Sequence, residues 1–485
     1  MTQTIAWPPA TTDTRATSPS VSWLGRLRRS IRSGGDLTLA ASSMALVSFS
    51  LPGRESPESS GGLDPIAVAK FGIRVAVLLW FSFVWLRWTR RHRPTFESGR
   101  HAHLVTQTLV PWFAYLAWAG VSIAWSPLTT VSLGQWLGLA ALILYAQAIA
   151  IRCSPLAEDS TERATRLLRT LLIVLGLYSS AVLTAFLISP EFSGLDRSVS
   201  LDGSDGLVHP TAAGATSSLG IALGVHCLIT GFRVPRWFLF ASLVIHGGVL
   251  LASASRSALL MAIVTVGVSL VLFLRSSTRG WLLFCIGGLA LTLMIVDPGF
   301  DLLSSGIQGT TGYVKRGQSI EQLQNASGRV EMWTAVWQQV ESSPVVGHGY
   351  FVTSSNGRLD VWDGPANHDA HNLMLQVLVS TGVIGLAIFV WSGWRYVATL
   401  IRQLWQSPTG WTFGQRASSG TIPPKLPAMI AILTLWYAGW SQGCVTFLGP
   451  IRPESVVFFT LLGLLASLPD RRAQGSPPAT PRKAR

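Results

Sequence analysis

Long apolar runs recur along nearly the whole 485-residue chain, separated by polar segments that are mostly short. A membrane-spanning helix needs about 20 predominantly apolar residues. Runs of about this length predict twelve transmembrane helices, over residues 37–53, 66–88, 104–125, 131–151, 168–189, 210–231, 237–253, 257–275, 280–297, 372–398, 426–448 and 454–469. The pattern therefore predicts an all-α integral membrane protein with a polytopic membrane domain over residues 37–469.

The two ends of the chain lack hydrophobic periodicity. Residues 1–36 are rich in Thr, Ser, Pro and Arg, and residues 470–485 have a similar polar composition. Such segments cannot bury enough apolar surface to fold, so both are predicted to be disordered tails.

The composition excludes an ordinary soluble protein, because only 12% of the residues are charged and 49% are hydrophobic. Twenty tryptophans fit the same class, since Trp favours the two membrane interfaces. The four cysteines lie in or beside apolar runs, at no metal-ligand spacing. They are predicted to be small buried hydrophobes without a disulfide framework.

The distribution of basic residues predicts the orientation. With a cytoplasmic N-terminus, 27 of the 37 Lys and Arg residues fall on the cytoplasmic side and 8 on the other, while Lys70 and Arg74 lie within the second span. The positive-inside rule then places both termini in the cytoplasm of a cell whose inner membrane holds the protein. The net charge of +14 needs no nucleic acid partner to explain it.

This topology places the longest loop, residues 298–371 between the ninth and tenth spans, outside the cytoplasm. The loop ends in "ANHDAHN", directly before the tenth span. His371 lies at the membrane boundary beside Asn372, with Asp369 two residues earlier. Imidazole titrates near neutrality, so His371 is a natural proton acceptor for a hydroxyl nucleophile. His368 and His348 remain alternatives.

A zinc site on His368 and His371 is a competing interpretation, since the two residues are three apart. No cysteine lies nearby and the acidic residues there form no ligand motif, so no metal site is predicted.

Two arginines of the outer segments are candidate anion ligands. Arg256 stands between two apolar runs among small residues that leave it accessible, although such a residue is also a common membrane anchor. Arg329 opens a stretch in which Val330, Trp333, Trp337 and Val340 recur at helical spacing. This apolar face is expected on the membrane or on the bundle, and Arg329 in the first turn favours an anion unless it is simply solvated.

A short outer loop adds further polar candidates. His209 precedes a run of small residues that permits close helix packing, and Arg197 and Asp202 lie in the loop before it. A structural role for His209, and ordinary loop polarity for the other two, are the alternatives.

Four motifs together resemble the O-antigen ligase superfamily. They are "HPTAAG", "SASRSALL", "SGRVEMWTAVWQQVESSPVVGHGYF", and "HN" followed after nine residues by "GVIG". The resemblance covers about residues 190–390. Thr211 is a departure, because the family usually has Asn after that His-Pro pair.

The resemblance implies a metal-independent, inverting glycosyl transfer on the extracytoplasmic face, with no cofactor. The donor would be a glycan on a polyprenyl diphosphate in the membrane lipid, and the acceptor a hydroxyl of lipid A–core or of another glycan. His371, Arg329 and Arg256 would be catalytic, the arginines pairing with diphosphate oxygens. The expected substrate-binding residues are Arg197, His209, Arg316, Asn372, Asp369 and Arg74. Gly382 and Gly385 would let a neighbouring helix approach closely.

Three acceptor classes remain open, namely those of a ligase, a repeat-unit polymerase and a protein O-glycosyltransferase, with the ligase favoured. A polysaccharide exporter or flippase is the alternative from a different class. It would carry polar residues through the bundle, whereas the candidates here gather on one side. A purely structural scaffold would not explain the ordered His and Arg motifs.

Overall fold

The computed structural model describes residues 35–46, 65–91, 96–127, 129–154, 160–189, 193, 195, 208–230, 234–273, 329–351, 370–406, 426–445 and 447–468. The helices are α2 (Gly35–Leu46), α3 (Pro65–Arg91), α4 (Phe96–Val121), the 3-10 turn η2 (Ser122–Trp125), α5 (Thr129–Arg152), α6 (Ser160–Ile188), α9 (Pro210–Thr230), α10 (Arg236–Ala252), α11 (Arg256–Phe273), α15 (Arg329–Ser342), α16 (Leu373–Gln406), α17 (Leu426–Trp440) and α18 (Pro453–Ser467).

Helices occupy every predicted span that falls within these residues, which contain no β-strand. The all-α prediction is therefore confirmed for the described part, while the predicted span 280–297 lies outside it. Several boundaries differ: α4 and α6 each begin eight residues earlier than predicted, and α16 ends eight residues later. Gly35 and Asp36, predicted as the end of the tail, begin α2, and α17 ends at Trp440, well before the predicted end at residue 448.

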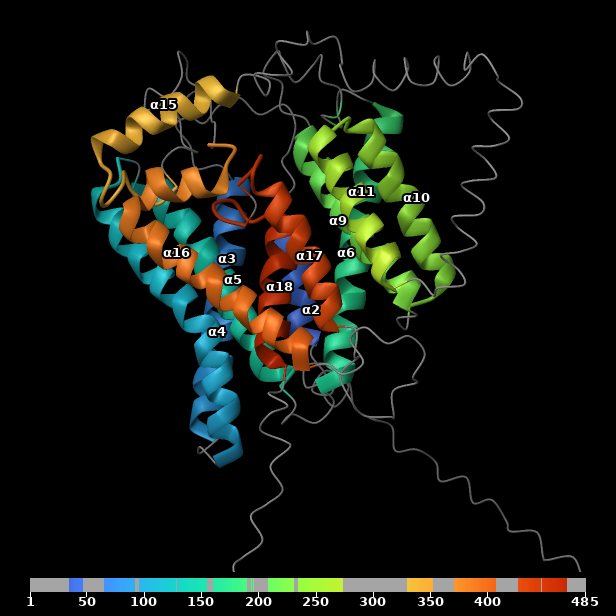
Figure 1. Cartoon of the computed structure of the whole chain (residues 1–485), viewed down its shortest axis with the longest axis horizontal. Coiled ribbons are helices and arrows are strands. Elements are labelled where there is room, and N and C mark those ends of the chain that lie inside the picture. The colour runs from blue at the N-terminus through green and yellow to red at the C-terminus, as the bar shows by residue number, and fades with distance from the viewer. Residues whose placement is uncertain are drawn as a thin grey trace, which may run out of the picture.

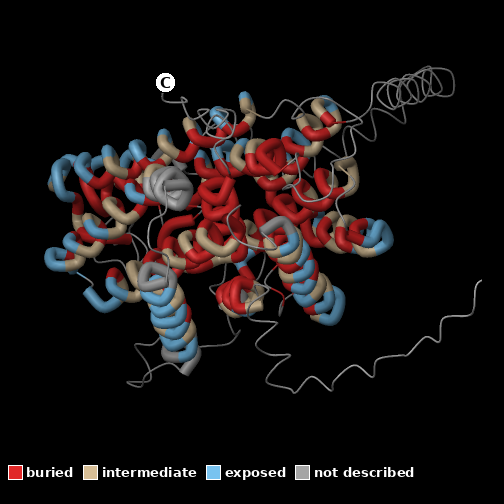
Figure 2. The backbone as a smooth tube through the Cα atoms, turned by 90° about the horizontal axis from the view of Figure 1, so that it is seen from below, coloured by how far each residue is buried: buried red, intermediate tan, exposed pale blue. Residues whose placement is uncertain are grey.

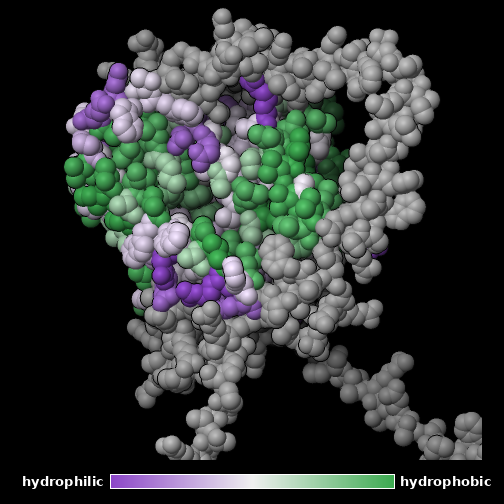
Figure 3. Space-filling model, in the orientation of Figure 1, coloured by the Kyte–Doolittle hydropathy of each residue, from purple (hydrophilic) through white to green (hydrophobic). Residues whose placement is uncertain are grey.

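The surface is that of a multi-pass membrane protein. Among the described helices, six are long and apolar enough to cross a membrane: Gln107–Trp125, Thr129–Arg152, Glu162–Ile188, Pro210–Thr230, Arg256–Phe273 and Leu373–Gln406. In Figure 3 a hydrophobic band lies between polar zones above and below. Large apolar side chains such as Leu79, Val244 and Trp394 are at least two-thirds exposed. Exposure of this kind is favourable in contact with lipid and unfavourable in water.

The last helix forms the centre of the bundle. Every residue of α18 is buried, as expected for a helix that is apolar on all sides. Figure 2 shows this distribution, with buried segments inside and exposed faces on the marginal helices. Trp112 of α4 packs edge-on against Phe389, Phe447, Phe458 and Phe459 at centroid distances of 5.6–5.9 Å. Such aromatic pairs each add about 0.5–1.5 kcal/mol beyond burial, and they join α4, α16 and α18.

The cysteines of the described segments are buried thiols, as predicted, and form no disulfide with one another: Cys153, Cys227 and Cys444. Burial raises the pKa of the Cys153 thiol to about 12, although Arg163 and Arg152 oppose the shift. A neutral, inaccessible thiol of this kind fills space rather than reacting.

The starts of α9, α11, α16 and α18 lie at one end of the molecule, which is at the top in Figure 1 and where α15 packs on α16. We call it the α15 end. The starts of α2 and α6 and the end of α5 meet at the opposite end of the bundle.

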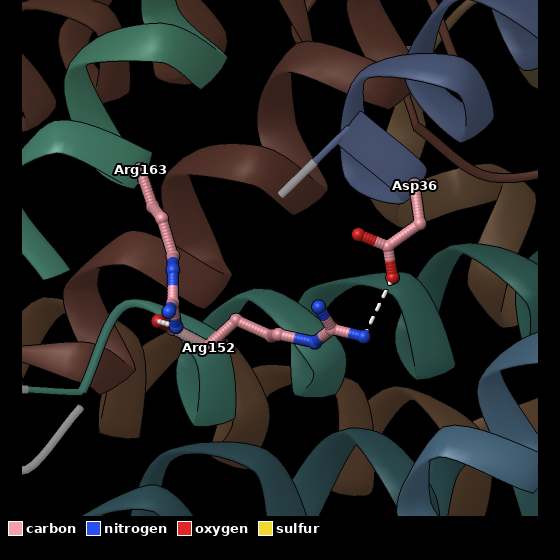
Figure 4. Close-up of polar contacts among 3 residues, drawn as sticks. All are labelled: Asp36, Arg152 and Arg163. Atoms are coloured by element: carbon pink, nitrogen blue, oxygen red, sulfur yellow. Dashed lines mark hydrogen bonds and ion pairs between the residues drawn. The ribbon is translucent and has the colours of Figure 1, made fainter. Parts of the chain in front are cut away.

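An ion pair fastens this opposite end. Asp36 of α2 lies 2.8 Å from the guanidinium of Arg152, and Arg163 of α6 donates a hydrogen bond of 3.0 Å to the Arg152 carbonyl (Figure 4). The Asp36 side chain is only 4% exposed and that of Arg152 19%. Helix α2 is thereby tied to the consecutive helices α5 and α6.

Replacing Asp36 by Ala removes the carboxylate and leaves the largely buried Arg152 charge without it. We expect the free energy of unfolding to fall by about 3 kcal/mol, measured as a lower thermal midpoint in detergent. The matched control is Glu162→Ala, which breaks the exposed 2.8 Å pair with Arg166 and should cost about 0.5 kcal/mol or less. Equal midpoints for the two variants would contradict this assignment.

Candidate active site

Helix α16 carries a break that defines the α15 end. Its 34 residues include Gly382, whose φ of 66° and ψ of −173° are not helical. In Figure 1 the part of α16 before this break runs across the top of the bundle, and the part after it runs down the bundle. The segment from Val383 to Gln406 is long enough to cross the membrane by itself. The predicted span 372–398 matches the start of the helix Leu373–Gln406, which ends eight residues later than predicted and contains the break at Gly382.

The turn after α15 supplies the hydrogen bonds that the break removes. Val383 N–H donates to Pro344 O at 2.9 Å, and Ile384 N–H donates to Val345 O at 3.3 Å. In return the His348 and Gly349 N–H groups donate to the carbonyls of Val379 and Ser380 at 3.0 and 2.9 Å. Irregular backbone at membrane depth is tolerated only when its polar groups are satisfied in this way.

Glycines make this close approach possible. A Cβ on Gly382 would collide with the Val345 carbonyl, and one on Gly347 (φ 67°) would lie 2.6 Å from Gly382 N. The predicted role of Gly382 in helix–helix packing was thus wrong, because the backbone of the turn after α15, and not a neighbouring helix, lies against it. Gly385 does match the prediction, since a Cβ there would lie 3.0 Å from the Trp118 ring of α4. The "GHGYF" and "GVIG" motifs are therefore two sides of one junction.

His371 sits directly before α16 in a strained conformation, with a φ of 43°. Asn372 Oδ1 accepts the Leu375 N–H at 3.1 Å and so caps the helix. On the other side, Ala370 N–H donates to Gln376 Oε1 at 2.9 Å, and its carbonyl accepts from Trp333 Nε1 at 3.0 Å. The half-buried His371 imidazole is thereby carried on a backbone fixed from both sides.

His348 has a structural place. Its Nε2 lies 2.8 Å from Gln339 O and 3.1 Å from Ser342 Oγ, so Nε2 donates to the carbonyl. These contacts hold the turn against the end of α15.

The other two motifs also meet through a glycine. A Cβ on Gly214 of "HPTAAG" would lie 2.8 Å from Ser253 Oγ and 2.7 Å from Ser255 Cβ, both in "SASRSALL". Ala254 between these serines has a φ of 45°, and Arg256 is the first residue of α11. At the start of α9, the exposed His209 accepts the Thr211 N–H through Nδ1 at 3.3 Å.

Helix α17 links the two motif pairs. Leu373 N–H of α16 donates to Ser441 O, just after α17, at 3.0 Å. Trp436 of α17 donates to Ser218 of α9 at 2.8 Å, and Gly439 leaves room for Met261 of α11. Both pairs are therefore anchored on the same helix.

The apolar face of α15 differs from the predicted one. Met332, Val336 and Val340 are its buried residues and pack against α16, whereas Trp337 is 51% exposed. Arg329 begins α15, but its side chain lies outside the described part, as do the residues Arg197, Arg316, His368 and Asp369.

Arg74 of α3 donates a hydrogen bond to Gly134 O at 2.7 Å. It lies within electrostatic range of Tyr350, whose hydroxyl accepts the Gly449 N–H at 3.4 Å. Burial raises the pKa of the Tyr350 phenol, with Arg74 opposing, so the phenol stays neutral. Tyr350 was missed from the sequence, although it follows the Gly-x-Gly of its motif directly.

Arg452 and Glu454 were also missed. Arg452 is the N-cap of α18, and Glu454 in the first turn is only 1% exposed. Arg452 lies within electrostatic range of the Glu454 carboxyl group, while Tyr437 donates to the Glu454 backbone carbonyl at 2.6 Å. The sequence does contain a signal for these residues, because Glu454 is a carboxylate directly after "IRP", at the start of an apolar span.

Residues 213–390 match the family described as O-antigen ligase. This part of the chain is similar to the O-antigen ligase/polymerase superfamily. Members of this superfamily are glycosyltransferase-like membrane enzymes of polysaccharide biosynthesis. A comparison with curated proteins finds no match. The O-antigen ligase segment contains all four motifs apart from the first four residues of "HPTAAG".

The junction between the turn and α16 predicts a specific sensitivity. Gly382→Ala forces a side chain into positive φ and against the Val345 carbonyl, so we expect the free energy of unfolding to fall by about 1–3 kcal/mol or more. Thermal unfolding followed by tryptophan fluorescence in detergent measures the change.

Gly393→Ala in the same helix is the control, because nothing lies within 4 Å of that Cβ position. Its midpoint should be unchanged or slightly higher. A Gly382→Ala variant as stable as Gly393→Ala would disprove the junction as described.

Proposed function

We propose that the chain transfers a glycan from a polyprenyl diphosphate, such as undecaprenyl diphosphate, to a sugar hydroxyl at the α15 end of the bundle. One observation supports the location of this site. Of the described non-glycine residues, those with positive φ are Ala254, Phe351 and His371, and each lies in or directly beside one of the four motifs. Such strain costs about 1–3 kcal/mol per residue and clusters at functional sites.

His371 is the proposed proton acceptor. The acceptor hydroxyl oxygen attacks the anomeric carbon, its proton passes to the imidazole, and the bond to the polyprenyl diphosphate breaks. Asn372 uses its side-chain oxygen as a helix cap, so its proposed contribution is to fix the backbone of His371.

Arg256 and Arg329 are the proposed ligands of the departing diphosphate. Each is the first residue of its helix, where exposed amide N–H groups also favour an anion. The guanidinium fork matches phosphate oxygens in pairs, which suits the charge that develops on the leaving group. Arg74, Arg197, Arg316, His209 and Asp369 are proposed to contact the substrates around these residues.

The predicted topology makes the α15 end extracytoplasmic, where a lipid diphosphate supplies the driving force in the absence of nucleotides. The "HN"–x9–"GVIG" spacing favours a ligase, with lipid A–core as acceptor, over a repeat-unit polymerase. In this proposal the enzyme lies in the inner membrane with both termini in the cytoplasm.

The role of His371 is tested by His371→Asn. Asn tolerates positive φ, so the fold is retained while the proton acceptor is lost. Transfer from a lipid-diphosphate glycan, followed by mass spectrometry, should fall by about 100-fold or more.

The matched control is His348→Gln, whose side-chain amide can still donate to Gln339 O. It should keep most of the wild-type activity. Full activity in His371→Asn would remove His371 from this role and favour His368.

Metal independence is tested separately by removing metal ions. We expect the purified enzyme to transfer at an unchanged rate in EDTA, because arginines rather than a metal ion neutralise the diphosphate. No three His, Cys, Asp or Glu side chains come together as a metal site within the described residues. Loss of activity in EDTA that zinc restores would instead support the site on His368 and His371.

A further inference from the structure

The turn that completes α16 also presents apolar side chains to the outside. Val345 is 56% and Val346 is 36% exposed, although the Val345 carbonyl accepts the Ile384 N–H at the helix break. Val383, which donates to Pro344 O, and Ile384, which donates to Val345 O, are 55% and 38% exposed. An apolar surface therefore lies where the turn after α15 contacts the spanning part of α16.

This surface continues the lipid-facing side of α16. Along the spanning part, exposed apolar residues recur at helical spacing: Val383, Val390, Trp394, Val397 and Ile401. Lipid suits such an apolar stripe on a membrane-spanning helix. Val345 and Val346 extend the stripe at its α15 end.

Tryptophans gather at the same level. The indole N–H of Trp118 donates to Thr381 O at 2.9 Å, that of Trp125 to Gly347 O at 3.2 Å, and that of Trp333 to Ala370 O at 3.0 Å. Tryptophan with a satisfied N–H and an apolar ring is typical of the membrane interface. The break in α16 thus lies at interfacial depth.

Helix α15 has the three faces that this position requires. Met332, Val336 and Val340 pack on the bundle, and Trp337 is a half-exposed apolar residue at the edge of that face. The polar residues of the remaining face are exposed: Thr334, Gln338, Glu341 and Ser342. A helix in the corner between a bundle and a membrane surface divides its side chains in this way.

We infer that Trp337, Val345 and Val346 form an interfacial patch that inserts into the outer-leaflet lipid at the boundary between headgroups and acyl chains. Helix α15 and the turn after it are then anchored in the membrane instead of standing free above it. The inference rests on the membrane topology and not on glycosyl transfer. Its consequence for the proposed reaction is that His371 is held at a fixed height above the lipid.

The test is photocrosslinking from the native chain in lipid nanodiscs. A benzophenone amino acid replaces Val346 in one variant and the exposed polar residue Gln338 in the control. Mass spectrometry counts covalent lipid adducts, and we expect roughly five-fold more at position 346. An equal or lower yield at 346, including none, overturns the inference, and crosslinks to a second copy would identify protein as the occupant.

A second measurement covers the case in which the bulky group distorts the turn. Cys153, Cys227 and Cys444 are buried, so a Cys285→Ser background with Val346→Cys or Gln338→Cys allows selective labelling by a small fluorophore. Nitroxide-bearing lipids should quench the label at 346 more than that at 338, and aqueous iodide should do the reverse. Stronger iodide quenching at 346 would place the turn in water and contradict the inference.

Discussion

The exchange of backbone hydrogen bonds between the turn after α15 and the break at Gly382 is the interaction on which the α15 end depends. A helix interrupted near the membrane leaves carbonyls and N–H groups that lipid cannot satisfy. Here Pro344, Val345, His348 and Gly349 satisfy them from a segment more than thirty residues away in sequence. Because both partners need glycine, at Gly347 and Gly382, neither segment adopts its geometry without the other.

That constraint explains why chemically weak motifs occur together. "GHGYF" and "GVIG" are complementary surfaces of the junction, and "HPTAAG" and "SASRSALL" meet in the same manner at Gly214. The glycines thus position their neighbours, His371 before α16 and Arg256 at the start of α11. Helix α17, through Ser441 and Trp436, keeps the two pairs at one end of the bundle.

The sequence predicted the helices well because apolar length alone determines a span, as for α5 and α9. The sequence-based predictions failed where contacts with a distant segment determine the backbone conformation. Gly382 looked like a packing glycine inside a continuous span, since the turn that replaces its helical bonds is distant in sequence. The same holds for Tyr350, Arg452 and Glu454, whose neighbours come from α3, α6 and α9. Trp333 and Trp337 were placed on one face because periodicity does not say which side meets the bundle.

The most direct test is to supply the purified protein, in nanodiscs, with a synthetic polyprenyl-diphosphate glycan and candidate acceptors. Mass spectrometry then follows free polyprenyl diphosphate and the glycan product. Release of the lipid diphosphate coupled to a lipid A-linked glycan is the predicted result, and a lengthened lipid-linked glycan would identify a polymerase. No turnover with any acceptor, together with movement of the intact lipid-linked glycan across liposomes, would contradict the account and indicate a transporter.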